Sequence, residues 1–318
     1  MSFRRISILG CGLIGGSFAL GLKKHGFGGE IVGCDRTEVL EKARARGAID
    51  RAVTEVAEAL DDADLVYLAT PVVTILDLLP EVAKAAKPGA LVTDAGSTKV
   101  RICRLASEVM PEGIQFLGGH PMAGKEVGGI ENADADLFVG TKYILVKGAE
   151  EQAKAFTTED TENTEEAQRK AGPSTRPSGS LGMTDQEQEF VGLVQMLGAE
   201  PVWMDAETHD WAAALVSHLP QLVSTALASA VWDETDEDGL PLSLAGVGFR
   251  DMARLAGSPY DVWRDVCLTN SENLARGLER LEQRLERMRR RLRSRELEEE
   301  FEKARQTYAM LKRGGKDE

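Results

Sequence analysis

The chain has 318 residues, a formal net charge of −14 and 42% hydrophobic residues. This length exceeds one typical hydrophobic core and predicts two domains. The acidic charge argues against nucleic-acid or anionic-membrane partners, because both require a basic surface. We find neither a secretory signal pattern nor an apolar run of membrane length, and we therefore expect a cytoplasmic protein. The four cysteines lack CxxC spacing and are expected to be reduced, structural thiols.

Short apolar runs alternate with helical patterns through the first half of the chain, which is typical of β-α-β units. Amphipathic stretches such as residues 40–46 and 75–86 lie between these runs. The predicted fold class is α/β, with a doubly wound parallel sheet in a domain of residues 1–148. The expected strands are residues 5–9, 31–34, 65–69, 91–94, 115–117 and 143–146.

The composition changes after this sheet. Residues 149–184 are rich in Glu, Thr, Ser, Pro and Gly, which predicts an acidic, disordered loop. Helical periodicity returns at residues 187–197, followed by a short strand at 201–204 and a helix at 206–233. We expect residues 185–318 to form an all-helical domain. Apolar residues from Leu274 to Leu292 recur with the spacing of one helix seam, which either packs on its own domain or forms a dimer contact.

A glycine-rich loop follows the first strand and opens a helix, with the sequence Gly10-Cys11-Gly12-Leu13-Ile14-Gly15. The first glycine allows a tight turn, the second lets the backbone approach a pyrophosphate, and the third lets helix and strand pack closely. The N–H groups at the helix start favour a phosphate group. The alternative is a glycine turn without a ligand.

Two further positions belong to the predicted cofactor site. Asp35 ends the second strand about 20 residues after the last glycine, where an acid accepts hydrogen bonds from the adenosine ribose hydroxyls. This acid favours NAD, whereas the adjacent Arg36 leaves NADP possible. Thr70 and Pro71 follow another strand and are expected to flank the nicotinamide or the phosphates, unless they form only a turn.

Two corners at the carboxyl ends of the predicted strands carry chemical groups. The segment from Asp94 to Lys99 puts the Ser97 hydroxyl and an ammonium group at a helix start, although such a serine is more commonly an N-cap. The segment from Gly118 to Gly124 places His120 beyond a strand end, in a glycine-containing loop. A histidine there can take the hydroxyl proton during dehydrogenation, a task that calls for a base with a near-neutral pKa.

The second half adds polar residues within helical patterns. His218 and Gln221 lie three residues apart on one helix face, and the intervening Pro220 predicts a kink. Arg250 offers bidentate recognition of a substrate carboxylate. Its alternative is an ion pair with Asp251 or another neighbouring acid.

Over residues 3–275 the chain resembles the prephenate and arogenate dehydrogenases of tyrosine biosynthesis. The resemblance rests on the glycine loop, on Asp94-Ala95-Gly96-Ser97-Thr98-Lys99, on Gly119-His120-Pro121-Met122-Ala123-Gly124 with Glu126, on Ser217-His218-Leu219-Pro220 and on Gly248-Phe249-Arg250-Asp251. It implies oxidative decarboxylation of prephenate to 4-hydroxyphenylpyruvate, or of arogenate to tyrosine, with NAD or NADP. It also implies a helical second domain that forms a homodimer.

The same resemblance implies roles for single residues. His120 would accept the proton of the ring hydroxyl, Ser97 would bridge that hydroxyl and the cofactor, and Arg250 would hold a substrate carboxylate. The remaining residues, His218, Gln221, Glu126 and Trp263, would line the substrate pocket. Glu126 would lie near the entrance, and Trp263 would either shape the pocket or be contributed across the dimer. The long acidic loop departs from the resemblance, and the charged helical end replaces the β-rich regulatory module of some relatives.

Three alternatives remain open at this level. The substrate can be prephenate or arogenate, which differ only in a keto or amino group. The chain can be another two-domain NAD(P) enzyme, such as a reductase of imines or 2-keto acids. It can also be a non-catalytic NAD(H) sensor that signals through the helix of residues 274–292.

Overall fold

The computed structural model describes residues 3–125, 127–147, 182–235, 239–294 and 296–314. The chain divides into two compact units, Met1–Ser271 and Glu272–Glu318. Most of the acidic loop predicted for residues 149–184, and Glu126, lie outside the described residues.

The first unit is built on an eight-stranded sheet in the order β3-β2-β1-β4-β5-β6-β7-β8. The pairs are parallel except β6 with β7, which are antiparallel. The predicted α/β fold class with a doubly wound, mainly parallel sheet is therefore confirmed, and one pair, β6 with β7, departs from the parallel arrangement. Between β6 and β7 the described chain has a short 3-10 turn, Ile130–Asn132, and lacks the crossover helix that a parallel return needs. The strands are β1 Arg5–Leu9, β2 Glu30–Cys34, β3 Arg51–Val53, β4 Leu65–Leu68, β5 Leu91–Asp94, β6 Gln115–Pro121, β7 Lys142–Val146 and β8 Glu200–Trp203.

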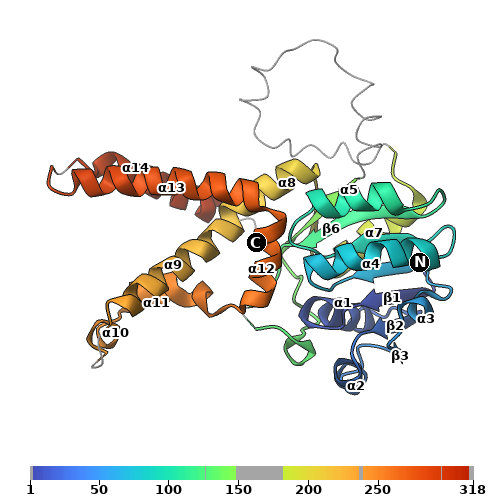
Figure 1. Ribbon diagram of the computed structural model, residues 1–318. Coiled ribbons are helices and arrows are strands. Elements are labelled where there is room, and N and C mark those ends of the chain that lie inside the picture. Colours follow the sequence, from blue (N-terminus) through green and yellow to red (C-terminus); the bar gives the residue numbers. More distant parts are fainter. Residues whose placement is uncertain (1–2, 126, 148–181, 236–238, 295, 315–318) are drawn as a thin grey trace, which may run out of the picture. The chain divides into compact units, whose positions relative to one another are not determined.

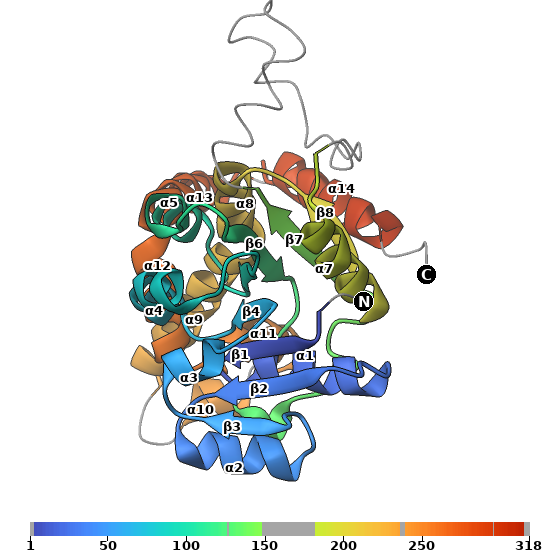
Figure 2. The same ribbon diagram turned by 90° about the vertical axis from the view of Figure 1, so that its right-hand side faces the viewer.

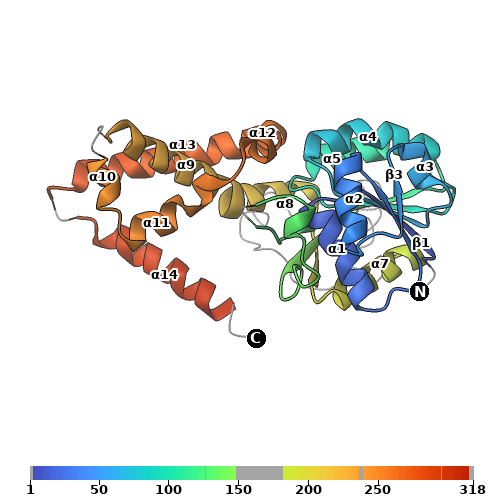
Figure 3. The same ribbon diagram turned by 90° about the horizontal axis from the view of Figure 1, so that it is seen from below.

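Helices cover both faces of this sheet (Figures 2 and 3). Successive strand residues point to opposite faces, so Leu65 and Tyr67 pack in one apolar cluster whereas Val66 and Leu68 pack in the other. The first cluster includes side chains of α1 Leu13–Lys24, α2 Thr37–Ala45 and α7 Asp185–Met196, and the second those of α3 Val56–Leu60, α4 Val72–Ala85 and α5 Val100–Val109. Burial on both faces explains why the central strands read as continuous apolar runs.

A helical part follows the sheet within the same unit (Figure 1). Its helices are α8 Ala206–Ala213, α9 Leu219–Asp233, α10 Leu240–Ser243, α11 Val247–Ala253 and α12 Tyr260–Thr269. A π-helical segment, Ala214–His218, joins α8 to α9 directly before Pro220. The predicted helix of residues 206–233 is thus confirmed, and the irregularity expected at the proline is this π segment, because proline cannot donate the usual backbone hydrogen bond.

The second unit contains two helices, α13 Ser271–Arg291 and α14 Glu298–Gly314. The helix predicted from the Leu274 to Leu292 spacing is α13. The domain boundaries drawn from the sequence stay a prediction, although β8 lies in the segment assigned there to an all-helical domain. Strand β8 pairs with β7 and completes the sheet.

Candidate active site

The glycine loop has the shape that a dinucleotide requires. Gly10 has a φ of +97°, and a Cβ atom there would lie 2.6 Å from the carbonyl carbon of Ala69. A Cβ atom on Gly15 would collide with the carbonyl oxygen of Gly10. Gly12, by contrast, faces open space, with nothing within 4 Å of its Cβ position. The loop therefore packs tightly on two sides and leaves its middle glycine free for a close-approaching phosphate.

The residues around the loop also fit a dinucleotide. Helix α1 starts at Leu13 with no side-chain cap and no acid in its first turn, so its N–H groups are not claimed by a side chain. Asp35 accepts the N–H of Cys11 at 2.8 Å, which holds its carboxylate beside the loop. Arg36 next to it is 81% exposed. Thr70, at the end of β4, has a buried hydroxyl with no hydrogen-bond partner among the described residues.

His120 lies within strand β6, not in a loop beyond the strand as the sequence indicated. It pairs with Ile144 of β7, and this antiparallel partner extends the strand through Pro121. Nδ1 of His120 lies 2.8 Å from Nε2 of His209, with the two rings at 74°. Burial, followed by the neighbouring His209 and Lys99, lowers the pKa of His120 well below 6.5. The imidazole is thus neutral at physiological pH, with a lower pKa than the near-neutral value expected.

Asp210 contacts His209 at the ring nitrogen that does not face His120. Its Oδ1 lies 2.8 Å from Nδ1 of His209 and accepts the backbone N–H of Lys99 at 2.7 Å. Its Oδ2 accepts the backbone N–H of Val100 at 3.0 Å. Asp210 on α8 therefore caps the start of α5. Ser97 is not the N-cap; the N-cap is Lys99, and Ser97 is half-buried in the loop before it.

Lys99 does not present its ammonium group at the helix start. The side chain is fully buried beneath β6, where Nζ forms an ion pair with Asp94 and donates to the carbonyl of Gly119 at 2.6 Å. Asp94 in turn accepts the N–H of Gly119 at 3.1 Å. This pair joins the end of β5 to the residue that precedes His120.

A second polar group lies on the helix after α8. His218 and Gln221 are both buried, as their shared face predicted, and Nε2 of His218, Oε1 of Gln221 and the Ser224 hydroxyl have no partner among the described residues. Nδ1 of His218 lies 3.3 Å from the amide nitrogen of Asn270, so the imidazole hydrogen stands on the unpartnered Nε2. Burial lowers the pKa of His218 to about 4. Buried polar atoms of this kind are positions where a polar ligand or a water molecule can bind.

The other predicted site residues differ in how close they lie to these histidines. Trp263 on α12 meets the His218 ring edge to face, with 6.0 Å between ring centroids, within the same chain. Arg250 on α11 is exposed, and the described residues offer it no ion pair, so the alternative pairing with Asp251 is not found. Helix α11 packs against α9. No hydrogen bond between described residues joins Arg250 to the histidines.

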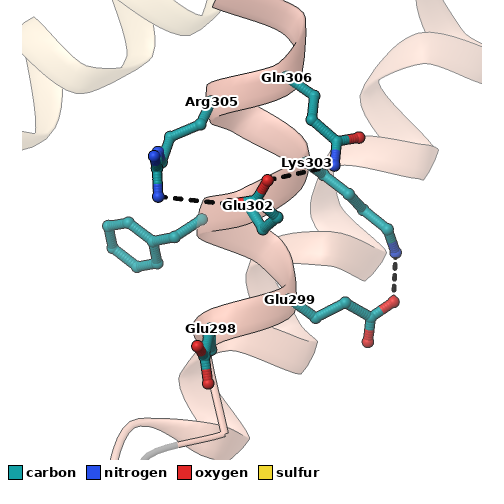
Figure 4. A pocket seen from close by; sticks show the side chains of 7 residues that line it. Glu298, Glu299, Glu302, Lys303, Arg305 and Gln306 are labelled. Atoms are coloured by element: carbon teal, nitrogen blue, oxygen red, sulfur yellow. Dashed lines mark hydrogen bonds and ion pairs between the residues drawn. The ribbon is translucent and has the colours of Figure 1, made fainter.

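The hollow on α14 shown in Figure 4 is a surface feature. Its lining side chains are exposed or lie along one helix, and Lys303 pairs with Glu299 one turn away at 2.5 Å. Such solvated pairs are ordinary on helix surfaces. The hollow therefore has none of the buried, unsatisfied groups that mark the site around His218.

His209 and Asp210 were missed in the sequence. They are adjacent, buried at 2% and 1% exposure, and lie in the first turns of a helix that is otherwise largely apolar. Two titratable residues at that place were the available signal. Neither has a motif of its own, because the row of Asp210, His209 and His120 forms only when α8 packs beside β6.

Comparison with known proteins agrees with this geometry. The family model "Prephenate dehydrogenase, nucleotide-binding domain" matches residues 18–161, and "Prephenate dehydrogenase, dimerization domain" matches residues 205–306. The chain is 35% identical over 281 residues to a prephenate dehydrogenase of Lactococcus lactis, an alignment that covers 88% of this chain and 68% of the relative. The chain thus spans about two thirds of that relative's length.

Two solved structures have the same fold throughout. Prephenate dehydrogenase from Aquifex aeolicus, in complex with hydroxyphenyl propionate and NAD+, is 28% identical with a TM-score of 0.80, covering 98% of this chain and 99% of that chain. An arogenate dehydrogenase from Synechocystis is 28% identical with a TM-score of 0.71, covering 97% and 99%. On these matches, the chain belongs to the prephenate dehydrogenase family and is a dehydrogenase with that family's nucleotide-binding and dimerisation domains.

Proposed function

We propose that this chain catalyses the NAD-dependent oxidative decarboxylation of prephenate to 4-hydroxyphenylpyruvate. The observation that carries the proposal is the neutral His120 imidazole, which is held through Nδ1 alone. Within the described part of the chain, no group hydrogen-bonds to its Nε2. An unprotonated ring nitrogen on a half-buried histidine at the carboxyl end of the sheet is suited to accept a hydroxyl proton.

His120 carries the proton transfers of the proposed reaction. Nε2 of His120 takes the proton of the ring hydroxyl as a carbonyl group forms at that carbon. NAD, when bound, supplies the hydride acceptor. The ring carboxylate leaves as carbon dioxide, and its electron pair restores the aromatic ring, so that the oxygen becomes a phenolate. His120 then returns the proton to this oxygen, and the reaction releases no net proton.

Other residues bind and orient the substrate in this proposal. The unpartnered Nε2–H of His218 and amide oxygen of Gln221 lie on one helix face and would hydrogen-bond polar groups of the substrate. The exposed Arg250 guanidinium would hold a carboxylate, since an acidic protein needs a local cation to bind a dianion. Ser97 would bridge the substrate hydroxyl and the nicotinamide. Trp263 would shape the pocket, and Glu126 is assigned a place near its entrance by resemblance.

The cofactor site contains Gly10, Gly12, Leu13, Ile14, Gly15, Asp35, Arg36, Thr70 and Pro71 in this proposal. The Asp35 carboxylate, held by the Cys11 N–H, favours the ribose hydroxyls of NAD and repels the 2′-phosphate of NADP. Asp35 is less exposed than Arg36, at 18% against 81% of the side chain, which makes the acid the closer neighbour of the loop.

An assay of reduced nicotinamide formation tests the reaction and the cofactor together. We expect the highest kcat/KM with prephenate and NAD, and at least about tenfold less with NADP, which is about 1.4 kcal/mol of discrimination. The four combinations of prephenate or arogenate with NAD or NADP are compared in one buffer. Absence of activity with both substrates would remove the proposed function.

Arogenate is the second candidate substrate. The arogenate dehydrogenase from Synechocystis is as similar in sequence, at 28%, as the prephenate dehydrogenase from Aquifex aeolicus. The same catalytic residues serve both substrates, because the keto and amino groups lie on the side chain and not on the reacting ring. A non-catalytic NAD(H) sensor is disfavoured by the two family matches and by the unsatisfied polar atoms around His218.

The helical part also carries the partner surface in this proposal. Large apolar side chains are exposed at 70–76% on α9, before and within α11, and on α12, namely Trp232, Leu244, Val247 and Tyr260. A patch of this kind in a soluble protein marks an interface. The helix Ala206–Asp233 is, contrary to the sequence analysis, long and apolar enough to span a membrane. Only 22% of its apolar window is buried, so most of this apolar surface needs a partner. We assign the exposed face to a second copy of the chain.

A homodimer in the cytoplasm is therefore expected. The full chain should be released without detergent after cell lysis and should sediment as a dimer at micromolar concentration. Sedimentation velocity on the detergent-free protein measures this. A monomer at that concentration, or recovery with the membrane fraction, would contradict the assignment of the apolar face.

A further inference from the structure

The row of Asp210, His209 and His120 restricts which ring nitrogens of the two histidines carry a hydrogen. A carboxylate only accepts hydrogen bonds, so Nδ1 of His209 must carry the hydrogen in its 2.8 Å contact with Asp210. A neutral His209 then has a free electron pair on Nε2. That atom, 2.8 Å from Nδ1 of His120, accepts a hydrogen from it.

We propose that His209 is a positioning residue that fixes the tautomer of His120, with the hydrogen on Nδ1 and the electron pair on Nε2. The inference rests on the proposed function, because an Nε2 electron pair matters only if His120 accepts a proton. Nε2 is the ring nitrogen that the described residues leave without a hydrogen bond. The reverse tautomer would carry its hydrogen on Nε2 and could not act as the base.

The row is rigid because Asp210 is fixed independently of the histidines. Its two oxygens accept the backbone N–H groups of Lys99 and Val100 at 2.7 and 3.0 Å. Its backbone carbonyl accepts from the side chain of Asn270 at 2.8 Å. Since Asp210 and His209 are almost fully buried, water has little access to exchange with these bonds. A carboxylate that orients a histidine in this way is an established device for setting the tautomer of a catalytic imidazole.

The charged and titratable groups that face His120 come from three elements. They are His209 on α8, Lys99 before α5 and His218 in the π segment, and each lowers the pKa of His120. Replacing His209 removes both its effect on this pKa and the acceptor of the Nδ1 hydrogen, so the pH at which His120 takes up a proton should change.

The test compares His209→Asn with His209→Gln. Asparagine is too short to reach His120, whereas the glutamine oxygen can stand near the former Nε2 and still accept from Nδ1. We expect His209→Asn to lower kcat about 100-fold, with little change in KM. This is the upper end of the loss found when a partner that orients a metal-binding histidine is removed. The acid limb of the variant's kcat/KM profile should shift relative to wild type. His209→Gln should lose about tenfold or less, because it restores the acceptor.

A direct readout needs no substrate. The chain has four histidines, so nitrogen-15 labelling of histidine gives few enough imidazole signals to assign. The exposed His25 serves as the matched control, since His25→Asn removes one signal without touching the row. We expect the wild-type His120 signal to show a protonated Nδ1 and an unprotonated Nε2, and His209→Asn alone to disturb it.

Two results would overturn the inference. One is a wild-type His120 that carries its hydrogen on Nε2, as a doubly protonated His209 would enforce. The other is a His209→Asn variant with an unchanged tautomer and pH profile. Both are separate from failure of the proposed function, because the tautomer is measured without turnover and the assay with prephenate and arogenate is read on the wild-type chain.

Discussion

Replacing His120 with asparagine is expected to lower kcat for prephenate oxidation by about 10³-fold, within the range that loss of a general base causes. The asparagine amide can still donate to His209 from near the former Nδ1 position, where the native distance is 2.8 Å. Only the Nε2 acceptor is removed. The variant should keep its affinity for NAD, because among the described residues no hydrogen bond joins the His120 side chain to the glycine loop after β1.

Steady-state formation of reduced nicotinamide measures the loss, and calorimetric titration with NAD measures the retained binding. The exposed His25 again supplies the control, since His25→Asn should leave both quantities unchanged. Turnover within tenfold of wild type in His120→Asn would show that another group accepts the proton. Loss of NAD binding would show that the substitution disturbs the sheet instead.

The wild-type pH profile follows from the same residue. Because burial and the nearby His209 and Lys99 lower the pKa of His120 below 6.5, the active, unprotonated form dominates above that pH. Activity should therefore be retained as the pH falls from 8 to about 6.5, and should be lost only at lower pH, where the imidazole takes up a proton. An acid limb centred above pH 6.5 would contradict the lowered pKa of the His120 imidazole.

The sheet was predictable because its physical signals are local. Strands buried on both faces read as apolar runs, and the glycine loop announces the first turn. Strand β3 was missed because Arg51–Val53 has three residues at a sheet edge and is only partly buried. The extension of β6 was missed because Gly118, Gly119 and Pro121 resemble turn residues. Their extended conformation depends on β7, which pairs with them in antiparallel register from about 25 residues away.

The residues of the candidate site also divide into those with a local sequence signal and those without one. His120, Ser97 and the glycine loop follow directly from motifs at strand ends. His209 lies 89 residues from His120 in sequence, and no local pattern joins them before α8 folds against the sheet. The burial of Lys99 was also not predictable from its motif, because a lysine before a helix is normally solvated. Only the packed structure shows that this ammonium group lies under β6 and that Asp210 caps the helix.

Replacing Lys99 with methionine is expected to cost about 3–5 kcal/mol of unfolding free energy, the loss that follows when one partner of a buried ion pair is removed. Lys99 and Asp94 are both 0% exposed, so no solvent replaces the missing ammonium group. Methionine keeps most of the side-chain volume. The cost therefore reflects the unpaired Asp94 carboxylate and the Gly119 carbonyl, which loses its 2.6 Å bond.

A double variant separates charge pairing from packing. In Asp94→Asn with Lys99→Met neither of the two positions carries a charge. The asparagine oxygen can still accept one of the two backbone N–H groups, from Gly96 or Gly119, that Asp94 accepts at 2.8 and 3.1 Å. We expect the double variant to be more stable than Lys99→Met alone by about 1–3 kcal/mol, because it no longer leaves a buried carboxylate without its partner. Guanidinium denaturation followed by circular dichroism measures all three chains. If both variants lose equal stability, the unpaired Asp94 carboxylate is not the cause of the loss in Lys99→Met.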